Sequence, residues 1–242
     1  DMAKSRGLGD VYKRQLHEFV KINFLAIINQ YKDKMNKLKL SGIYPISPHY
    51  IKSDDDYLEK CFNAISSGIN IFQFRSPYFS IRKRRYLLGE IYKYCVNFDV
   101  QLIINNDYNL ARLYEGSGVH IGKRDLPIKL IKSVIGTDRL IGFSCGGEII
   151  DLNQLKENGI SYYSIGAYAK SLTKTNTEEL TQETIKKYCD NNDLPMCIIG
   201  GLDMSNIESA MKYHPDMVAI CNGIFNQDKD RIKETIKKFQ EI

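Results

Sequence analysis

The chain of 242 residues is 43% hydrophobic and 26% charged, and 11% of its residues are aromatic. These fractions are typical of a globular protein with a sizeable core, and they exclude disordered, collagen-like and disulfide-scaffold chains. The 34 basic and 29 acidic residues leave a net charge of +5, which suits an anionic small molecule and is weak support for nucleic-acid binding. The longest apolar run, Val20–Ile28, is interrupted by Lys21 and Asn23 and is too short and too polar to span a bilayer, so we do not expect a membrane protein.

The six cysteines show neither a CxxC pair nor a metal-ligand spacing with the four histidines. No secretory signal precedes them, so we expect reduced thiols in a cytoplasmic protein. Free cysteine packs as a small apolar side chain, and we therefore expect buried structural thiols more than reactive ones. The six are Cys61, Cys95, Cys145, Cys189, Cys197 and Cys221.

The first part of the chain differs from the rest. Residues 1–15 show neither a two-residue nor a 3.6-residue period, and we expect a non-native or disordered leader there. From Leu16 to Lys34 the apolar residues mostly follow helical spacing, which predicts an N-terminal helix within residues 16–37 on the outside of the domain. Met35 is an alternative start of the native chain, because the strand pattern sharpens directly after it.

From residue 38 onward, short β-rich runs alternate with helical patterns. The runs predicted as strands are Leu40–Ile46, Ile69–Phe74, Gln101–Ile104, Val119–Ile121, Leu140–Phe143, Tyr162–Ile165, Met196–Ile199 and Met217–Cys221. The helices expected between and after them are Asp55–Ser67, Ile81–Phe98, Asn109–Glu115, Ile128–Ile135, Asp151–Asn158, Glu178–Cys189, Asn206–Tyr213 and Lys229–Phe239. Eight such repetitions imply a parallel sheet with right-handed crossovers, and favour a closed barrel over an open sheet. We therefore predict an α/β fold in which residues 38–242 form one (β/α)8 TIM barrel.

In such a barrel, the chemistry is expected at the C-terminal ends of the strands. At the second strand, the two-residue period places Gln73 and Arg75 on one face and Phe74 on the other. If the shared face points inward, an amide and a guanidinium suited to phosphate lie at the barrel mouth; the alternative is a solvated strand end. After the third strand, Asn105-Asn106-Asp107 offers polar ligands or, alternatively, an asparagine that caps the next helix.

The loop after the fourth strand combines two cations with a carboxylate, in Lys123, Arg124 and Asp125. Asp125 can cap the helix that Pro127 opens, or it can bind a hard divalent cation such as magnesium. His120 alternates with apolar neighbours on the strand itself, and a satisfied core histidine is the favoured interpretation over a catalytic one.

The later strands end in small and hydroxyl-bearing residues. Ser144 opens a Ser-Cys-Gly-Gly run that lets the backbone approach a ligand. The long segment 166–176 carries hydroxyls and Lys174, which suit a phosphate, although a solvated linker is the alternative. Gly200-Gly201 and Asn222-Gly223 precede helices after the last two strands, which matches the usual phosphate site of a barrel.

Several other chemistries are excluded by the residues themselves. The sequence contains no serine–histidine–acid order, no HExxH motif, no P-loop and no pair of catalytic carboxylates. The residues alone therefore predict a barrel whose mouth binds phosphate groups, with magnesium as an option.

Seven motifs occur in one order and resemble those of the thiamine phosphate synthase family. They are Tyr44-Pro-Ile-Ser-Pro48, Phe72-Gln-Phe-Arg75, Leu102-Ile-Ile-Asn105, Gly118-Val-His-Ile-Gly122 with Asp125-Leu-Pro127, Gly142-Phe-Ser144, Gly166-Ala-Tyr168 with Thr173-Lys174, and Ile199-Gly-Gly-Leu202. The resemblance covers residues 39–225 and implies a (β/α)8 barrel, in agreement with the strand pattern.

The resemblance implies a transferase reaction that joins the two halves of thiamin. An aminopyrimidine methyl diphosphate loses pyrophosphate, and the nitrogen of a thiazole phosphate attacks the resulting carbocation-like methylene carbon. Negative charge grows on the leaving diphosphate, where Mg2+, arginine and lysine stabilise it. By resemblance the diphosphate substrate is bound by Gln73, Arg75, Asn105, Ser144 and Lys174, of which all but Gln73 are also expected to be catalytic. The thiazole phosphate is expected on Ser171, Thr173, Gly201, Cys221 and Asn222, and Mg2+ on Asn106 and Asp125.

The chain departs from the family pattern at several of these positions. The second magnesium aspartate of the family falls on Asn106, and Asp107 beside it is expected to point elsewhere. The family commonly has a basic residue two places beyond the arginine, and this chain has Pro77 there. Lys123 and Arg124, in a neighbouring loop, are expected to compensate for the lost positive charge. Milder changes place Ser171 at the first threonine of the Thr-x-Thr-Lys loop and Asn222 at a serine.

Two alternative functions stay open at this point. The related thiazole tautomerase shares the barrel, but its catalytic histidine lies in the loop after strand 5, where this chain has Cys145-Gly146-Gly147. A non-catalytic barrel that binds a thiamin-related phosphate is the second, because an aspartate and a lysine of the family are missing. Dependence on magnesium separates these two functions from the synthase. The synthase should need magnesium, the tautomerase should not, and the binding barrel should catalyse no reaction. The expected partners are small molecules, without nucleic acid or membrane, and a homo-oligomer is open.

Overall fold

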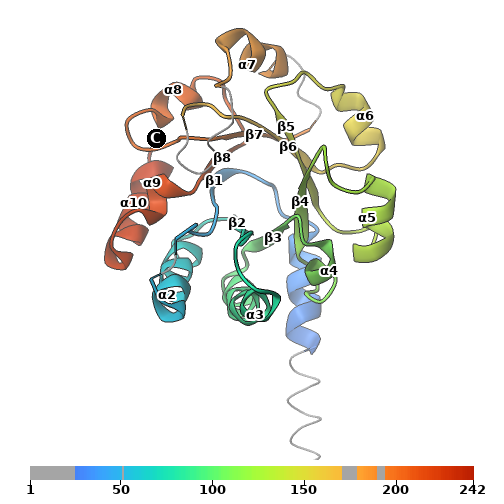
Figure 1. Cartoon of the computed structure of the whole chain (residues 1–242), viewed down its shortest axis with the longest axis vertical. Coiled ribbons are helices and arrows are strands. Elements are labelled where there is room, and N and C mark those ends of the chain that lie inside the picture. Colours follow the sequence, from blue (N-terminus) through green and yellow to red (C-terminus); the bar gives the residue numbers. More distant parts are fainter. Residues whose placement is uncertain (1–24, 51, 171–178, 190–193) are drawn as a thin grey trace, which may run out of the picture.

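We describe the protein from a computed structural model, in which residues 25–50, 52–170, 179–189 and 194–242 are placed well enough to describe. Eight parallel strands form one sheet in the order β1-β8-β7-β6-β5-β4-β3-β2 (Figure 1). The strands are β1 Gly42–Pro45, β2 Ile71–Phe74, β3 Gln101–Asn105, β4 Gly118–Gly122, β5 Ile141–Gly146, β6 Tyr162–Ile165, β7 Met196–Ile199 and β8 Met217–Ile220. The predicted (β/α)8 architecture is therefore confirmed.

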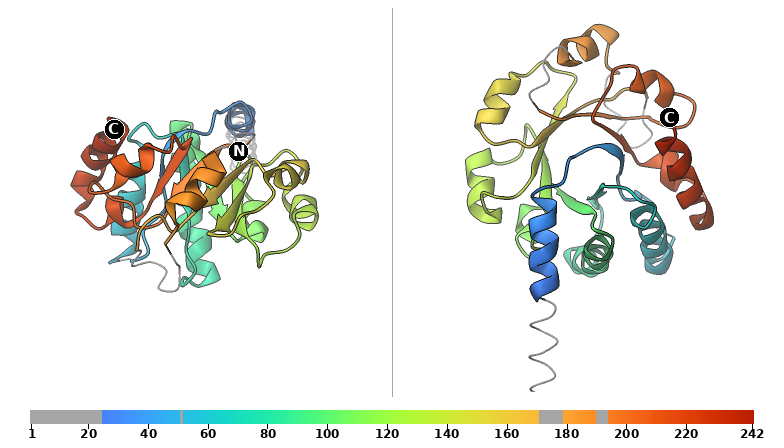
Figure 2. Two further views of the ribbon diagram at one scale, coloured as in Figure 1. Left: turned by 90° about the horizontal axis from the view of Figure 1, so that it is seen from above. Right: turned by 180° about the vertical axis from the view of Figure 1, so that it is seen from behind.

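Helices surround the sheet on its outer side, as both views in Figure 2 show. They are α2 Asp54–Ile65, α3 Ile81–Phe98, α4 Tyr108–Ala111, α5 Ile128–Ile135, α6 Leu152–Glu157, α7 Gln182–Cys189, α8 Ile207–Met211, α9 Asn222–Phe225 and α10 Ile232–Gln240, with a 3-10 turn at Lys229–Arg231. None of the helices in the described ranges combines the length and the apolar character needed to cross a membrane.

Some helix boundaries differ from the predicted ones. Helix α4 has only four residues and ends at Ala111, because the chain then turns sharply to enter β4. Helix α9 is a single turn directly after β8, and it was not predicted because one turn leaves no periodic signal to detect. Asn222 and Gly223 form the start of this helix, so the expectation that they precede a helix was wrong. The last helix begins at Ile232, three residues later than expected, since Lys229–Arg231 forms the 3-10 turn.

The sheet separates two hydrophobic clusters. Ile71 faces the inside of the barrel, together with Tyr44, Ile103 and Tyr162 from other strands. Phe72, the next residue, faces the helices and belongs to the outer cluster. This alternation follows from the two-residue period of a strand, and it directs Gln73 and Arg75 inward as predicted.

The barrel closes between β1 and β2 at a narrow seam beside these two polar residues. Ile46 and Gln73 form an isolated parallel bridge there. Ser47 extends the seam, because its backbone N–H donates to the carbonyl of Gln73 at 2.8 Å and its Oγ accepts from the backbone N–H of Arg75 at 2.9 Å. The hydroxyl donates in turn to the carbonyl of Arg75 at 3.2 Å. Side-chain hydrogen bonds thus replace part of the missing strand ladder.

A helix at residues 25–35 precedes the barrel, within the range 16–37 predicted for an N-terminal helix; residues 1–24, the expected leader included, lie outside the described residues. Its Tyr31 is buried, and the hydroxyl donates to the carbonyl of Val100 at 2.7 Å and accepts from the N–H of Leu102 at 3.2 Å. The ring packs edge-on against Tyr92 of α3. Since Val100 and Leu102 flank the start of β3, this helix contacts the end of the barrel opposite to the strand C-termini.

Replacing Tyr31 with Phe tests whether this helix is part of the folded domain. The substitution removes both hydrogen bonds and leaves the buried carbonyl of Val100 and the N–H of Leu102 unpaired. We expect the free energy of unfolding to fall by about 1–3 kcal/mol in urea denaturation. The matched control is Tyr78→Phe, whose side chain is 79% exposed and should change stability by less than about 0.5 kcal/mol. Equal stability of the two variants would contradict a packed helix.

Candidate active site

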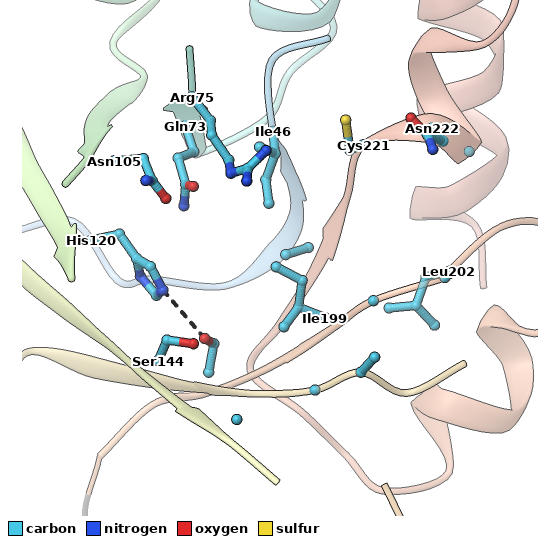
Figure 3. A pocket seen from close by; sticks show the side chains of 18 of the residues that line it. Ile46, Gln73, Arg75, Asn105, His120, Ser144, Ile199, Leu202, Cys221 and Asn222 are labelled. Atoms are coloured by element: carbon cyan, nitrogen blue, oxygen red, sulfur yellow. Dashed lines mark hydrogen bonds between the residues drawn. The ribbon is translucent and has the colours of Figure 1, made fainter. Parts of the chain in front are cut away.

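A cavity of about 630 Å³ opens at the C-terminal ends of the strands, and residues from all eight strand ends line it. Two sides of different character face each other across it (Figure 3). Polar side chains from β2 to β5 form one side, and glycines and small or apolar residues from β7 and β8 form the other. The predicted site residues that line the cavity are Gln73, Arg75, Asn105, Asn106, Ser144, Gly201, Cys221 and Asn222.

Gln73 and Arg75 leave the end of β2 and point into the cavity (Figure 3). Gln73 is buried, and its Nε2 donates to the hydroxyl of Tyr44 at 2.8 Å. The backbone of Arg75 is held by Ser47, so the strand end that carries the guanidinium is fixed. Within the described ranges no acidic side chain pairs with Arg75, and the guanidinium fork is therefore available to an anion.

The third and fourth strands bring an amide and a carboxylate together at the edge of the cavity. Asn106 Nδ2 donates to Asp125 Oδ1 at 3.3 Å, and Asn105 Nδ2 donates to Asn106 Oδ1 at 2.8 Å. The other carboxylate oxygen of Asp125 accepts from the backbone N–H of Gly122 at 2.7 Å. Asn106 has a φ of 58°, a left-handed conformation that asparagine adopts more readily than most residues.

Asp125 does not cap the following helix, and that alternative was wrong. Helix α5 has Pro127 at its N-cap without a side-chain cap bond, because Asp125 folds back onto Gly122 instead. Asp107, by contrast, is a cap: its Oδ1 accepts from the N–H of Leu110 at 3.0 Å. Its Oδ2 accepts from Arg84 Nη1 at 2.6 Å, so both oxygens of Asp107 are committed to structure.

Lys123, in the loop after β4, has different surroundings from Arg75. Lys123 forms an ion pair with Glu148, so its charge is partly balanced by a side chain beyond β5. Lys170, which sequence reasoning did not single out, is exposed and lines the cavity after β6. It was missed because it lies one residue before the hydroxyl-rich run on which the motif was defined. Ser171, Thr173 and Lys174 lie outside the described residues, and their roles stay predictions.

The floor of the cavity between β4 and β6 carries His120 and Ser164. His120 is buried and points into the cavity (Figure 3). Its Nδ1 lies 3.0 Å from the hydroxyl of Tyr162, and its Nε2 lies 3.3 Å from the hydroxyl of Ser164. Both ring nitrogens are thus engaged, which agrees with the interpretation of a satisfied core histidine. Tyr44, Ser47, Tyr162 and Ser164 were missed as site residues, although Tyr44 and Ser47 lie in the first motif and the two-residue period directs Tyr162 and Ser164 inward.

The side formed by β7 and β8 allows close backbone approach. Gly201 has a φ of 65°, and a Cβ there would lie 2.5 Å from the carbonyl oxygen of Ala169. A Cβ on Gly223 would lie 2.6 Å from the carbonyl oxygen of Leu202. Glycine is therefore required at both positions, and this side can meet a ligand through main-chain groups and the Asn222 amide.

Cys221 and Cys145 lie at or next to residues that line the cavity, and both are held as thiols. Cys221 lines the cavity and its Sγ donates to the carbonyl of Ser47, while burial raises the pKa of the thiol to about 11. Burial also raises the pKa of Cys145 to about 11. A thiolate is the nucleophilic form of cysteine, so neither residue is suited to covalent catalysis at neutral pH.

Comparison with known proteins gives a consistent result. The family model described as thiamine monophosphate synthase matches residues 43–224. A thiamine-phosphate synthase from Nitrosomonas eutropha is 27% identical over 192 residues, which cover 79% of this chain and 90% of the relative. One from Alkaliphilus oremlandii is 29% identical over 199 residues, which cover 82% and 94%.

A solved structure has the same fold. The thiamine phosphate pyrophosphorylase from Pyrococcus furiosus superposes with a TM-score of 0.70 at 21% sequence identity. The superposition covers 86% of this chain and 97% of that one. At this level of identity, the likeness bears on the barrel architecture.

Replacing Arg75 with Ala tests whether the cavity binds phosphate anions. Each charge-assisted hydrogen bond that the guanidinium makes contributes about 1.5–3 kcal/mol, so the Kd for inorganic pyrophosphate should rise about 10- to 100-fold. Isothermal titration calorimetry measures it directly. Arg82→Ala on α3 removes the same charge from an exposed position that does not line the cavity, and its Kd should stay within about twofold of the unmodified protein. Equal weakening by both variants would point to general electrostatics instead of a site.

Proposed function

This chain belongs to the thiamine monophosphate synthase family, and we propose that its cavity joins an aminopyrimidine methyl diphosphate to a thiazole phosphate with release of pyrophosphate. As a thiamine-phosphate synthase, the protein is a transferase of thiamine biosynthesis. Its substrates are small molecules that both carry phosphate groups. The reaction breaks the bond between the methylene carbon and the diphosphate, and forms one between that carbon and the thiazole nitrogen.

The division of the cavity into two sides is the observation that carries this proposal. Arg75 and the polar groups of β2 to β5 suit a diphosphate and a heterocycle with hydrogen-bonding edges. The glycine-rich side of β7 and β8 suits a second, smaller phosphate bound through the backbone. Two substrates held in one cavity react at a high effective concentration, which supplies part of the rate acceleration.

Charge stabilisation at the leaving group is the task of the polar side. As the carbon–oxygen bond breaks, negative charge grows on the diphosphate, and a guanidinium beside it stabilises this state more than the ground state. We assign this role to Arg75, whose backbone is held at the β1–β2 seam. Asn105 and Ser144 are proposed to hold the same substrate, and Lys174 to share the charge stabilisation. Gly201, Cys221 and Asn222, with Ser171 and Thr173, are proposed to hold the thiazole phosphate.

A magnesium ion is part of the proposal, and the residues present fit it. The carboxylate of Asp125 and the amide of Asn106 are hydrogen-bonded at the cavity edge, and both side chains carry oxygen atoms of the kind that Mg2+ prefers. Mg2+ is commonly held by one or two carboxylates together with substrate phosphates and water. Asp125 and Asn106 would hold the ion, which would neutralise charge on the diphosphate. Among the described residues no group of three or more acidic, histidine or cysteine side chains is clustered for a metal. In this proposal the phosphates of the substrate and water complete the site.

The observations weigh against the tautomerase alternative. A catalytic histidine after β5 would be needed, and the residues there are Cys145-Gly146-Gly147, of which Cys145 is buried with a raised pKa. We propose the cytoplasm as the place of action, since four of the cysteines are buried and suited to a reducing compartment.

Pyrophosphate release by the purified protein tests the function. With both thiamin precursors and Mg2+ present, we expect pyrophosphate and thiamin phosphate in equal amounts, and EDTA should abolish both because the leaving group is then less stabilised. A coupled phosphate assay and mass spectrometry measure the two products. No release, with the thiazole phosphate still bound, would leave a phosphate-binding barrel. Isomerisation of the thiazole without magnesium would favour the tautomerase.

Replacing Asn106 with Asp tests the metal site. A second carboxylate beside Asp125 adds negative charge at the proposed ligand position, so the Mg2+ concentration for half-maximal activity should fall by about tenfold. Direct Mn2+ binding, followed by electron paramagnetic resonance with pyrophosphate present, should tighten in parallel. Asp107→Asn is the control, because both oxygens of Asp107 are committed to Arg84 and the α4 cap. A larger effect at Asp107 than at Asn106 would overturn this metal assignment.

A further inference from the structure

A chain of polar side chains runs beneath the floor of the cavity. Gln73 contacts Tyr44, whose hydroxyl is 2.8 Å from that of Tyr162. Tyr162 contacts His120, which contacts Ser164 on the far side. Gln73, His120 and Ser164 line the cavity, whereas the two tyrosines are at most 1% exposed and lie below it. The polar chain therefore begins and ends at the cavity, and its two tyrosines are buried below it.

With Gln73 Nε2 as the donor to Tyr44, the hydrogen bonds of this polar chain follow one direction. Gln73 Nε2 donates to the oxygen of Tyr44, so the hydroxyl proton of Tyr44 is directed to the oxygen of Tyr162. The proton of Tyr162 is then directed to Nδ1 of His120. A neutral imidazole that accepts at Nδ1 carries its proton on Nε2 and donates it to Ser164. Burial raises the pKa of Tyr162 and keeps its proton in place.

This direction sets what the two ends offer to a ligand. Since its Nε2 is committed to Tyr44, Gln73 presents Oε1, an acceptor that has no hydrogen-bond partner elsewhere in the described chain. Since Ser164 accepts from His120, its own proton is available to the cavity. One end thus accepts and the other donates. If the chain ran in the opposite direction, both ends would be reversed.

The space for this chain is provided by a glycine. A Cβ on Gly142 would lie 2.1 Å from Cζ of Tyr162 and 2.5 Å from Nδ1 of His120. Only glycine at this position of β5 lets the Tyr162 ring cross the barrel interior and reach both Tyr44 and His120. The chain is therefore built into the packing of the strands.

We propose that the buried chain of Tyr44, Tyr162 and His120 positions Gln73 as an acceptor and Ser164 as a donor, and so selects a 4-aminopyrimidine over a 4-oxopyrimidine. A 4-aminopyrimidine carries an amino donor and ring-nitrogen acceptors, which match the acceptor of Gln73 and the donor of Ser164. A 4-oxopyrimidine carries a carbonyl acceptor and a ring N–H donor instead, so the same cavity would oppose like groups and leave them unpaired. This inference rests on the proposed function for the presence of a pyrimidine; it adds the positioning residues and the basis of selectivity.

Replacing Tyr162 with Phe interrupts the chain at its centre. The Tyr44 hydroxyl then loses its acceptor and can donate to Gln73, which allows the amide to turn and present its NH2 group. We measure Kd for the 4-amino and 4-oxo forms of 5-hydroxymethyl-2-methylpyrimidine by calorimetry, and kcat/KM for their diphosphates. The ratio of amino to oxo preference should fall by about tenfold or more, while KM for the thiazole phosphate stays unchanged. Tyr44→Phe should act in the same way.

Tyr163→Phe is the matched control. It removes a buried tyrosine hydroxyl from the next position of β6, but that hydroxyl faces outward and donates to the carbonyl of Tyr188. Its amino-to-oxo ratio should equal that of the unmodified protein, with thermal unfolding used to confirm that all variants are folded.

The outcomes separate this inference from the proposed function. An unchanged ratio in both Tyr162→Phe and Tyr44→Phe, no preference in the unmodified protein, or binding of neither pyrimidine would overturn the positioning role. Selective pyrimidine binding that depends on the two tyrosines, without pyrophosphate release, would keep the positioning role and reject the synthase reaction.

Discussion

The closure of the eight-stranded sheet between β1 and β2 is the constraint on which the site depends. Only a single bridge, Ile46 to Gln73, joins these strands by register, and Ser47 completes the seam with three hydrogen bonds to the backbones of Gln73 and Arg75. The seam therefore lies beside Gln73 and Arg75, two of the polar residues that line the cavity. Closure also brings Tyr44 of β1 within hydrogen-bond distance of Gln73 on β2 and Tyr162 on β6.

Inside the closed barrel, the two-residue period of each strand directs alternate side chains inward, where they form a ring. Near the mouth this ring is polar on β2 to β5 and small on β7 and β8. A cavity with one polar side that carries Arg75 and one glycine-rich side suits two phosphate-bearing substrates that must react with each other. The reaction of the family requires two such substrates, and the metal position at Asn106 and Asp125 lies at the edge of the polar side.

Much of this arrangement is predictable from sequence, because it depends on short periods. Alternation along β2 places Gln73 and Arg75 correctly, and the succession of strands and helices predicts the barrel. The contacts of Tyr44 with Tyr162 are not predictable in this way, since 118 residues separate them and only barrel closure unites them. Asp125 was ambiguous for a related reason: a carboxylate before Pro127 is typical of a helix cap, and only the tight turn onto Gly122 decides otherwise. Helix α9 escaped prediction because a single turn has no period.

A crystal structure of the enzyme with a non-hydrolysable pyrimidine diphosphate analogue and thiazole phosphate tests the central claim most directly. The account predicts the diphosphate on Arg75, the amino edge of the pyrimidine on Gln73, and the thiazole phosphate against Gly201 and Asn222. Electron density for both ligands on the same side of the cavity, or for the pyrimidine away from Gln73, would contradict it.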